Sequence, residues 1–148
     1  MGKITLKDAD IKLDTGTAVL GSALDLSGYS TSVTIDIGKD EVENTAFSST
    51  THTYQADGLM TLAISIDIQA DYADNSIDEQ LWSLFTSDTG IVVEIKPTSD
   101  AVGASNPKYS GTYSLQSYTP VGGSVGDLAT HGTLNLVPTT GGLTRAVA

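Results

Sequence analysis

Residues Asn106–Arg145 read NPKYSGTYSLQSYTPVGGSVGDLATHGTLNLVPTTGGLTR. From Tyr109 to Tyr118, tyrosine, leucine and glycine alternate with serine, threonine and glutamine, which is the two-residue period of a strand with one buried face. A glycine-rich segment follows, and a second strand is predicted over Thr130–Val137. Two alternating strands joined by such a loop indicate an antiparallel sheet.

The same period recurs upstream. Thr31–Ile37 alternates apolar with polar side chains, and Leu59–Ala70 is the clearest alternating run of the chain. These two runs predict a hairpin with one dry face and one polar face, with the segment between them at its tip. Ile91–Lys96 is predicted as a further strand that stops at Pro97.

One helix is predicted over Ser76–Ser87. Ser76 is a favourable N-cap and Glu79 follows three residues later, the spacing of a capping box. One apolar face is formed by Ile77, Leu81, Leu84 and Phe85. Trp82 lies beside that face, and we expect it to pack in the core or between helix and sheet; the alternative is an anchor between subunits.

This order of elements predicts a mainly β fold: an antiparallel β-sandwich or half-barrel with one flanking helix and a long inter-strand loop. The 148 residues are expected to form one domain. We expect an N-terminal arm and first strand over residues 1–28, with loop-like sequence from Thr15 onward, and an exposed C-terminal arm over residues 138–148.

The segment Gly38–Gly58 is long and polar. Loops beyond about 12–15 residues are uncommon in compact domains and are usually functional or disordered. Two interpretations stay open at this point: a flexible insertion, or a segment that becomes ordered on a partner.

Composition limits the function classes. The chain has no cysteine, which excludes disulfides and thiolate sites. Its formal net charge of −11 argues against binding to nucleic-acid phosphates and to anionic membranes. No run resembles a signal peptide or a membrane span, so we expect a soluble product made in a cytoplasm.

The sequence contains partial matches to catalytic and metal-binding motifs, but the residues around each match do not fit the motif. Gly122–Gly126 matches a nucleophile-elbow pattern around Ser124, but Pro120 precedes it and too few residues follow for the required helix. The segment with Asp8, Asp10 and Asp14 has Leu13 and Val19 where a calcium-binding EF-hand loop requires glycine and glutamate. His52 and His131 lie far apart in sequence. We therefore expect no enzyme, no cofactor and no catalytic residue.

A generic calcium site is the remaining metal alternative. Its oxygen ligands would come from Asp71, Asp74, Asn75 and Asp78. Acidic residues at the start of a helix explain the same cluster through the helix dipole, and we favour that explanation. No metal site is predicted.

Several short motifs occur in an order that resembles the major tail tube proteins of long-tailed, non-contractile, siphovirus-type bacteriophages. The resemblance covers roughly Asp25–Arg145. Its parts are Tyr29–Ile37 running into DEVENTAF (40–47), Asp57-Gly58-Leu59, Asp71-Tyr72, Leu81-Trp82, VEIKP (93–97), Asn106-Pro107, Tyr118-Thr119-Pro120, GDLAT (126–130) and Thr144-Arg145.

The resemblance implies hexameric rings that stack into a hollow tube, through which DNA is ejected without specific binding. It implies that a sheet of each subunit lines the lumen and that a long loop orders when rings stack. Further implied partners are the tape-measure, tail-tip and tail-terminator proteins, and no membrane partner is implied. The protein would be made in the host bacterial cytoplasm and located in the virion tail.

Two residue sets follow from combining the resemblance with the alternation. The expected lumen face carries Ser32, Thr34, Asp36, Thr61, Ser65, Asp67 and Gln69. The expected stacking loop carries Asp40, Glu41, Glu43, Thr45, Phe47, His52 and Tyr54. The rival functions are a tube protein of a contractile injection or secretion system, and an extracellular β-sandwich binding module.

Overall fold

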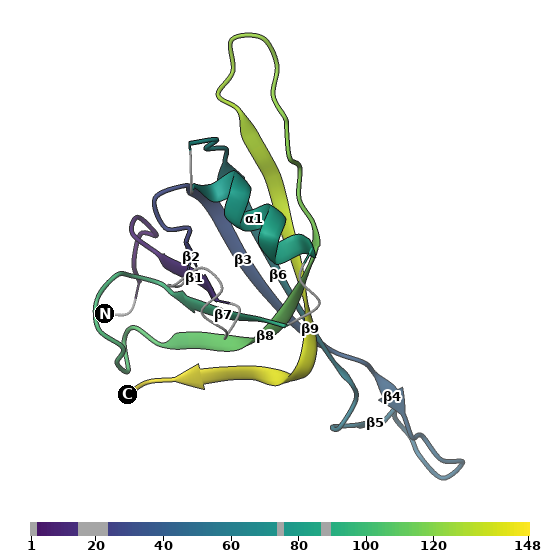
Figure 1. The fold of residues 1–148 in the computed structure, drawn as a ribbon. Helices are drawn as coiled ribbons and strands as arrows, with labels where there is room; N and C mark the ends of the chain where they lie inside the picture. Colours follow the sequence, from purple (N-terminus) through teal and green to yellow (C-terminus); the bar gives the residue numbers. More distant parts are fainter. Residues whose placement is uncertain (1–2, 15–23, 74–75, 87–89) are drawn as a thin grey trace.

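One antiparallel sheet of seven strands curls into a half-barrel (Figure 1). The computed structural model describes residues 3–14, 24–73, 76–86 and 90–148. Across the sheet the order is β2 (Leu24–Asp25), β1 (Asp10–Asp14), β7 (Ile91–Lys96), β8 (Lys108–Ser117), β9 (Thr130–Ala146), β6 (Met60–Gln69) and β3 (Ser30–Lys39). The predicted mainly β fold is confirmed, in its half-barrel form.

The core fills the inside of this curl. Strand β6 is central to it because it pairs with β3 on one side and β9 on the other, so that Ile64 lies opposite both Ile35 and Leu136. The four inward apolar residues of β6, from Leu62 to Ile68, are each 5% exposed or less. The alternation predicted for this strand is therefore confirmed, as is its hairpin with β3.

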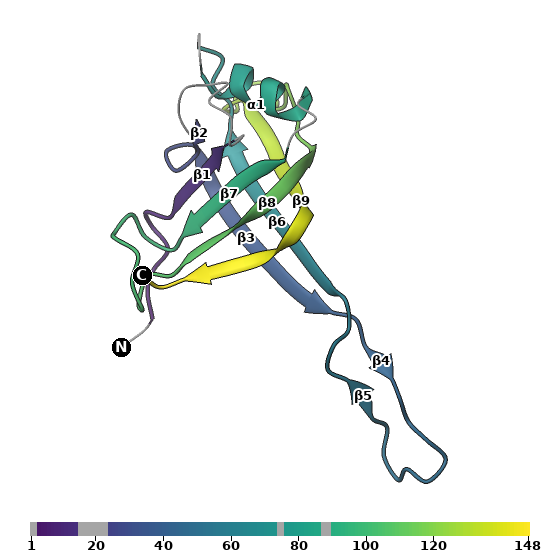
Figure 2. The same ribbon diagram turned by 60° about the horizontal axis from the view of Figure 1, so that its bottom comes forward.

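Helix α1 (Ile77–Thr86) covers one end of the half-barrel (Figure 2). Ile77, Leu81 and Leu84 are buried, as the apolar spacing predicts. The core position expected for Trp82 is wrong, because this side chain is 57% exposed. Trp82 follows Leu81 directly and is therefore rotated by about 100° around the helix axis, away from the sheet. Phe85, expected on the same apolar face, is 43% exposed, with its ring edge-on to Tyr118.

The C-terminal segment 138–148 is mostly exposed, as we expected, but it is part of the sheet and not an arm. Strand β9 continues through Pro138 to Ala146 and pairs with β8, with Tyr109 opposite Arg145. The ladder shifts register between Ser110 and Thr112 and again between Thr112 and Tyr113. Such irregularities bend a strand and accommodate a proline, which cannot donate a backbone hydrogen bond to the ladder.

The N-terminal region contains a first strand, as expected, and also a second. β1 pairs with β7, and the two-residue β2 pairs with β1 within a stretch that we expected to be a loop. Leu26, just after β2, is fully buried and its backbone N–H donates to the Ile11 carbonyl. Most of the expected loop, residues 15–23, lies outside the described residues.

Candidate functional surfaces: a polar sheet face and a projecting hairpin

The seven residues expected on a lumen face lie together on the outer face of β3 and β6. Cross-strand partners place their side chains on the same face of a sheet, and Ser32 is paired with Asp67 and Thr34 with Ser65. Asp36 and Thr61 continue the same alternation on their strands, opposite Ala63 and Gly38. None of the seven is buried. The structure thus brings this set together on the side away from the core.

Sequence reasoning missed the continuation of this face onto β9 and β8. Thr133 is paired with Asp67 and donates a hydrogen bond from its hydroxyl to that carboxylate. Asn135 is paired with Ser65, and its side-chain amide donates to the Ser117 hydroxyl at 2.8 Å. The alternation of Leu134 and Leu136 with Thr133 and Asn135 was the available signal, but only a known strand order identifies which strands are neighbours.

The charge on this face is negative. Asp36 and Asp67 are carboxylates, and no lysine or arginine shares the face within β3, β6 or the Thr130–Val137 part of β9. Hydroxyl and amide groups fill most other positions. We call these residues the outer polar face: Ser32, Thr34, Asp36, Thr61, Ser65, Asp67, Gln69, Thr133 and Asn135. Such a surface is wettable and repels phosphate instead of binding it.

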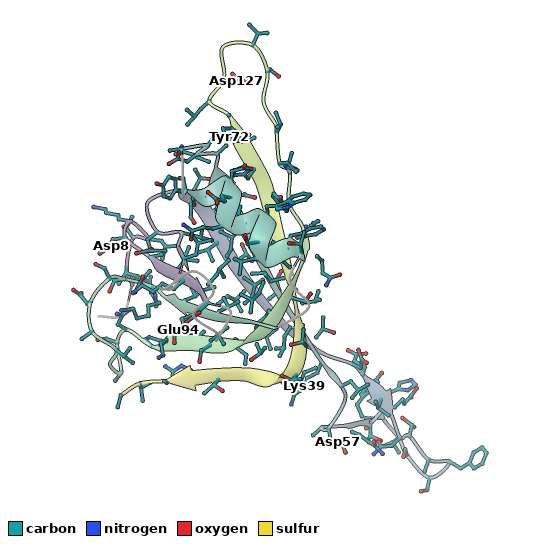
Figure 3. All side chains as sticks on the ribbon, viewed as in Figure 1. Asp8, Lys39, Asp57, Tyr72, Glu94 and Asp127 are labelled. Atoms are coloured by element: carbon teal, nitrogen blue, oxygen red, sulfur yellow. The ribbon has the colours of Figure 1, made fainter. Side chains whose placement is uncertain are left out.

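The second surface is a hairpin that extends far beyond the half-barrel between β3 and β6 (Figures 1 and 2). We expected Gly38–Gly58 to be a loop, but it contains the two-residue strands β4 (Val42–Glu43) and β5 (Tyr54–Gln55), which pair with each other. Figure 3 places Lys39 and Asp57 at its base, where the Asp40 N–H donates to the Leu59 carbonyl at 2.8 Å.

Polar side chains hold the two arms of the hairpin together beyond β4 and β5. Thr53 donates its hydroxyl to the Asn44 side-chain oxygen at 2.8 Å, and its N–H to the Thr45 hydroxyl at 3.0 Å. His52 Nδ1 lies 2.5 Å from a Glu43 carboxylate oxygen. All seven residues of the expected stacking set are exposed, and Phe47 at the tip is completely so. No residue of Asp40–Gly58 contributes to the buried core.

The pKa of the Glu43 carboxylate can be used to test whether the side-chain contacts across this hairpin form in solution. Its pKa is lowered below the ordinary 4.5 by the hydrogen bonds from His52 and Thr45. A depressed folded-state pKa stabilises the closed hairpin above the ordinary pKa, and this contribution is lost as the pH falls through the folded value.

We expect His52→Ala to raise the pKa of Glu43 toward 4.5, measured by carbon-detected NMR titration of the side-chain carboxyl. The Thr53→Ala control removes only a hydroxyl that bonds to Asn44, and it should leave the pKa of Glu43 unchanged. An unchanged pKa in the His52 variant would mean that the two side chains are not in contact in solution.

The described residues offer no metal or nucleophile site. No three His, Asp or Glu side chains among them gather closely enough to hold a metal ion. Asp71 instead accepts the Ala73 N–H at 3.0 Å and the Tyr29 hydroxyl at 3.1 Å. Two of the residues considered for calcium, Asp74 and Asn75, lie outside the described part. Ser124 lies in an irregular loop together with Gly122 and Gly126. This loop is not the strand–turn–helix that a nucleophile elbow requires.

The two histidines play unrelated parts. His131 is fully buried and its Nδ1 donates to the Thr119 carbonyl at 2.9 Å, which connects the start of β9 to the segment just after β8. His52 lies on the projecting hairpin. Along the described parts of the chain, no helix is both long and apolar enough to cross a membrane.

A curled antiparallel half-barrel with one flanking helix and a long projecting hairpin defines the tail-tube fold class. Comparison with solved structures supports this. The chain is similar to a chain of the virion of a native gene transfer agent particle, with 18% identity, a TM-score of 0.74, and 97% of this chain and 99% of that chain covered.

Two further structures have the same fold. The tail of an empty gene transfer agent particle with C6 symmetry matches at 18% identity and a TM-score of 0.75, covering 97% of this chain and 99% of that chain. The SPP1 tail tube matches at 12% identity and a TM-score of 0.76, covering 99% of this chain and 80% of that chain. No family model and no curated protein matches the sequence.

Proposed function

We propose that this protein is the tube-forming protein of a siphovirus-type phage tail. Copies of the chain form hexameric rings, and the rings stack into a hollow tube through which DNA is ejected. The observation that carries the proposal is the likeness over nearly the whole chain to a chain of a gene transfer agent virion and to two tail structures, with TM-scores of 0.74–0.76. The C6 symmetry of one of those tails supports the sixfold ring.

The two surfaces supply the parts that such a tube needs. The outer polar face lines the lumen, where Asp36 and Asp67 repel DNA phosphates so that the cargo slides past without binding. The hairpin Gly38–Gly58 extends from the body and contacts the next ring. The long edge strand β3 leaves its outer backbone groups for pairing with a neighbouring copy in the ring.

The role is structural and not enzymatic, and no cofactor takes part. The protein is made in the host bacterial cytoplasm and resides in the virion tail. Its other partners are the tape-measure, tail-tip and tail-terminator proteins. The solved structures named above are a gene transfer agent virion and two tails, so a contractile-system tube protein and an extracellular binding module are less well supported.

Negative-stain electron microscopy of the purified, concentrated protein at neutral pH tests the proposal. We expect hollow tubes or stacked rings whose end-on averages have sixfold symmetry. A protein that remains monomeric at all concentrations, and also when tail-tip complexes are added as initiators, would contradict the proposed function.

A further inference from the structure

An apolar groove lies where the half-barrel fails to close. Strand β3 is the last strand on one side of the sheet, and β7 and β8 approach it across the opening without pairing to it. The groove between them has a volume of about 200 Å³. Its lining is mainly apolar: Leu6, Val33, Ile35, Ile95, Pro97 and Tyr109. Toward the base of the hairpin, Ile37 and Met60 continue the apolar surface and are each more than half exposed.

Arg145 lies beside this groove and has no counter-ion within the described part of the chain. Cross-strand pairing places Ile11, Ile95, Tyr109 and Arg145 in one row on the inner face of β1, β7, β8 and β9. The row begins buried and ends at Arg145, which is exposed. Among the described residues, no ion pair or hydrogen bond involves its side chain. An unpaired guanidinium next to an apolar groove favours a partner that carries both an apolar group and a carboxylate.

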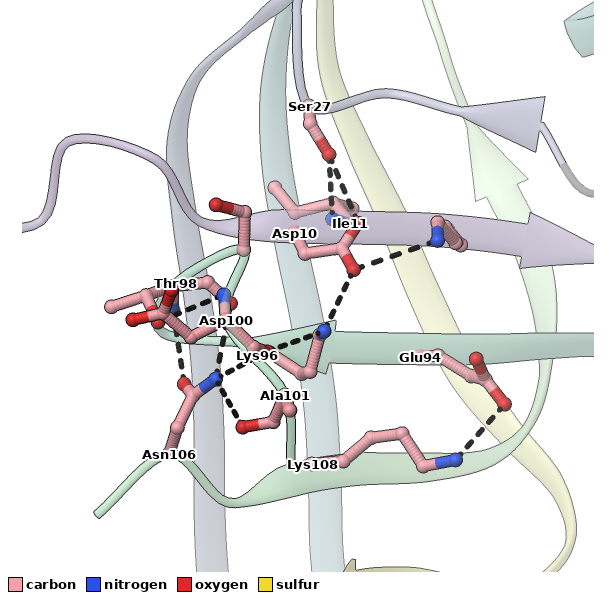
Figure 4. Close-up of polar contacts among 12 residues, drawn as sticks. Asp10, Ile11, Ser27, Glu94, Lys96, Thr98, Asp100, Ala101, Asn106 and Lys108 are labelled. Atoms are coloured by element: carbon pink, nitrogen blue, oxygen red, sulfur yellow. Dashed lines mark hydrogen bonds and ion pairs between the residues drawn. The ribbon is translucent and has the colours of Figure 1, made fainter. Parts of the chain in front are cut away.

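The two lysines on β7 and β8 beside this row, Lys96 and Lys108, are already paired (Figure 4). Lys96 lies 3.2 Å from an Asp10 carboxylate oxygen and Lys108 lies 3.4 Å from one of Glu94. Asn106, nearly buried, donates to the carbonyls of Asp100 and Ala101 and so fixes the loop at this edge. On this side of the groove, from β7 to β9, Arg145 is thus the cation without a partner among the described residues.

The hairpin of the same chain has the complementary features. Phe47 is completely exposed at its tip. The segment Gly38–Gly58 has one lysine, Lys39, and four carboxylates: Asp40, Glu41, Glu43 and Asp57. Its own groove is out of reach, because the hairpin continues the line of β3 and β6 away from the body (Figure 2). The occupant must then belong to another copy.

We propose that the tip of the hairpin docks in the groove of a second copy, with Phe47 against the apolar lining and a hairpin carboxylate on Arg145. This inference rests on the proposed function, because it names the surface that receives the hairpin in a stack of rings. Exposed aromatic side chains that enter an apolar pocket beside an arginine are the usual centres of interface energy. The charge difference between the two surfaces fixes the direction in which the rings stack.

The chain has no cysteine, so paired cysteines test the contact directly. One preparation carries Phe47→Cys and a second carries Tyr109→Cys; they are mixed, assembled into tubes, oxidised and run on a non-reducing gel. We expect a disulfide-linked dimer in tubes and none in the unassembled mixture. The control mixture of Phe47→Cys with Trp82→Cys should give no dimer, because Trp82 is exposed on α1, away from the groove.

A second measurement covers the case in which Tyr109→Cys fails to assemble. Arg145→Glu should raise the concentration needed for tube formation by about tenfold or more, because it removes the charge that the hairpin meets. Lys39→Glu makes the same change in net charge on the hairpin side and should not weaken assembly.

The outcomes separate this inference from the proposed function. Tube formation by the wild type, together with a disulfide between Phe47→Cys and Tyr109→Cys copies, supports both. If the wild type forms tubes but Phe47→Cys links to Trp82→Cys instead, or assembly is insensitive to Arg145→Glu, the docking site is overturned and the tube function is left intact. A wild-type chain that never forms tubes overturns both.

Discussion

An Ile64→Asp variant is expected not to fold. Ile64 is 1% exposed at the centre of β6, with inward neighbours from both adjacent strands. An ionised carboxylate there costs several kcal/mol in desolvation, and truncation of a buried isoleucine costs about 2–5 kcal/mol more. A domain of this size has a total stability of roughly 5–15 kcal/mol. The variant should therefore lack a cooperative thermal unfolding transition by circular dichroism.

Ser65→Asp is the matched control because it makes the same kind of change one residue later. Ser65 lies on the outer polar face and is only half-buried. We expect this variant to be soluble and to unfold cooperatively near the wild-type temperature. If Ile64→Asp also folded normally, the inner and outer faces of the sheet would be assigned the wrong way round.

Replacing Asn44–Thr53 with the two-residue turn Asn-Gly should give a folded protein that cannot form tubes. The deleted residues make no contribution to the core, and β4 and β5 are left with a connection suited to a tight hairpin. The free energy of unfolding should change little, while the tip that carries Phe47 is lost. Thermal denaturation measures the first effect and negative-stain microscopy the second.

Ser49→Ala is the control for this deletion. It removes a hydroxyl that accepts the Ala46 N–H at the tip but keeps the length of the hairpin. Tubes should form with this variant. Tubes formed by the shortened chain would show that the hairpin is not the element that joins one ring to the next.

The local sequence pattern was sufficient to predict which side chains of a single strand or helix are buried. The alternation of β6 predicted its inward residues because both sides of the strand are paired, and the spacing of Ile77, Leu81 and Leu84 predicted the buried face of α1. Period and capping are properties of a short window of sequence. They hold regardless of which element the window packs against.

The misses depend on partners that are distant in sequence. Pro138 and the glycines after it are typical of an arm. The segment is nevertheless a strand, because it pairs with the edge of β8. Likewise, Gly38–Gly58 has the composition of a loop, yet Asn44, Thr45 and Thr53 close it by hydrogen bonds across the turn. The outer polar face could be predicted on β3 and β6, whereas its extension to Thr133 required the strand order.

The position of β9 has a consequence for how this chain is made. β9 is the latest strand in sequence, yet it lies in the interior of the sheet between β8 and β6. During synthesis one edge of β6 and one edge of β8 remain unpaired until β9 has been made. The sheet therefore cannot form by adding strands in the order of the sequence. Contacts this distant in sequence slow folding to the millisecond-to-second range. In the tube that we propose, incomplete copies would present no finished ring surface to a growing assembly.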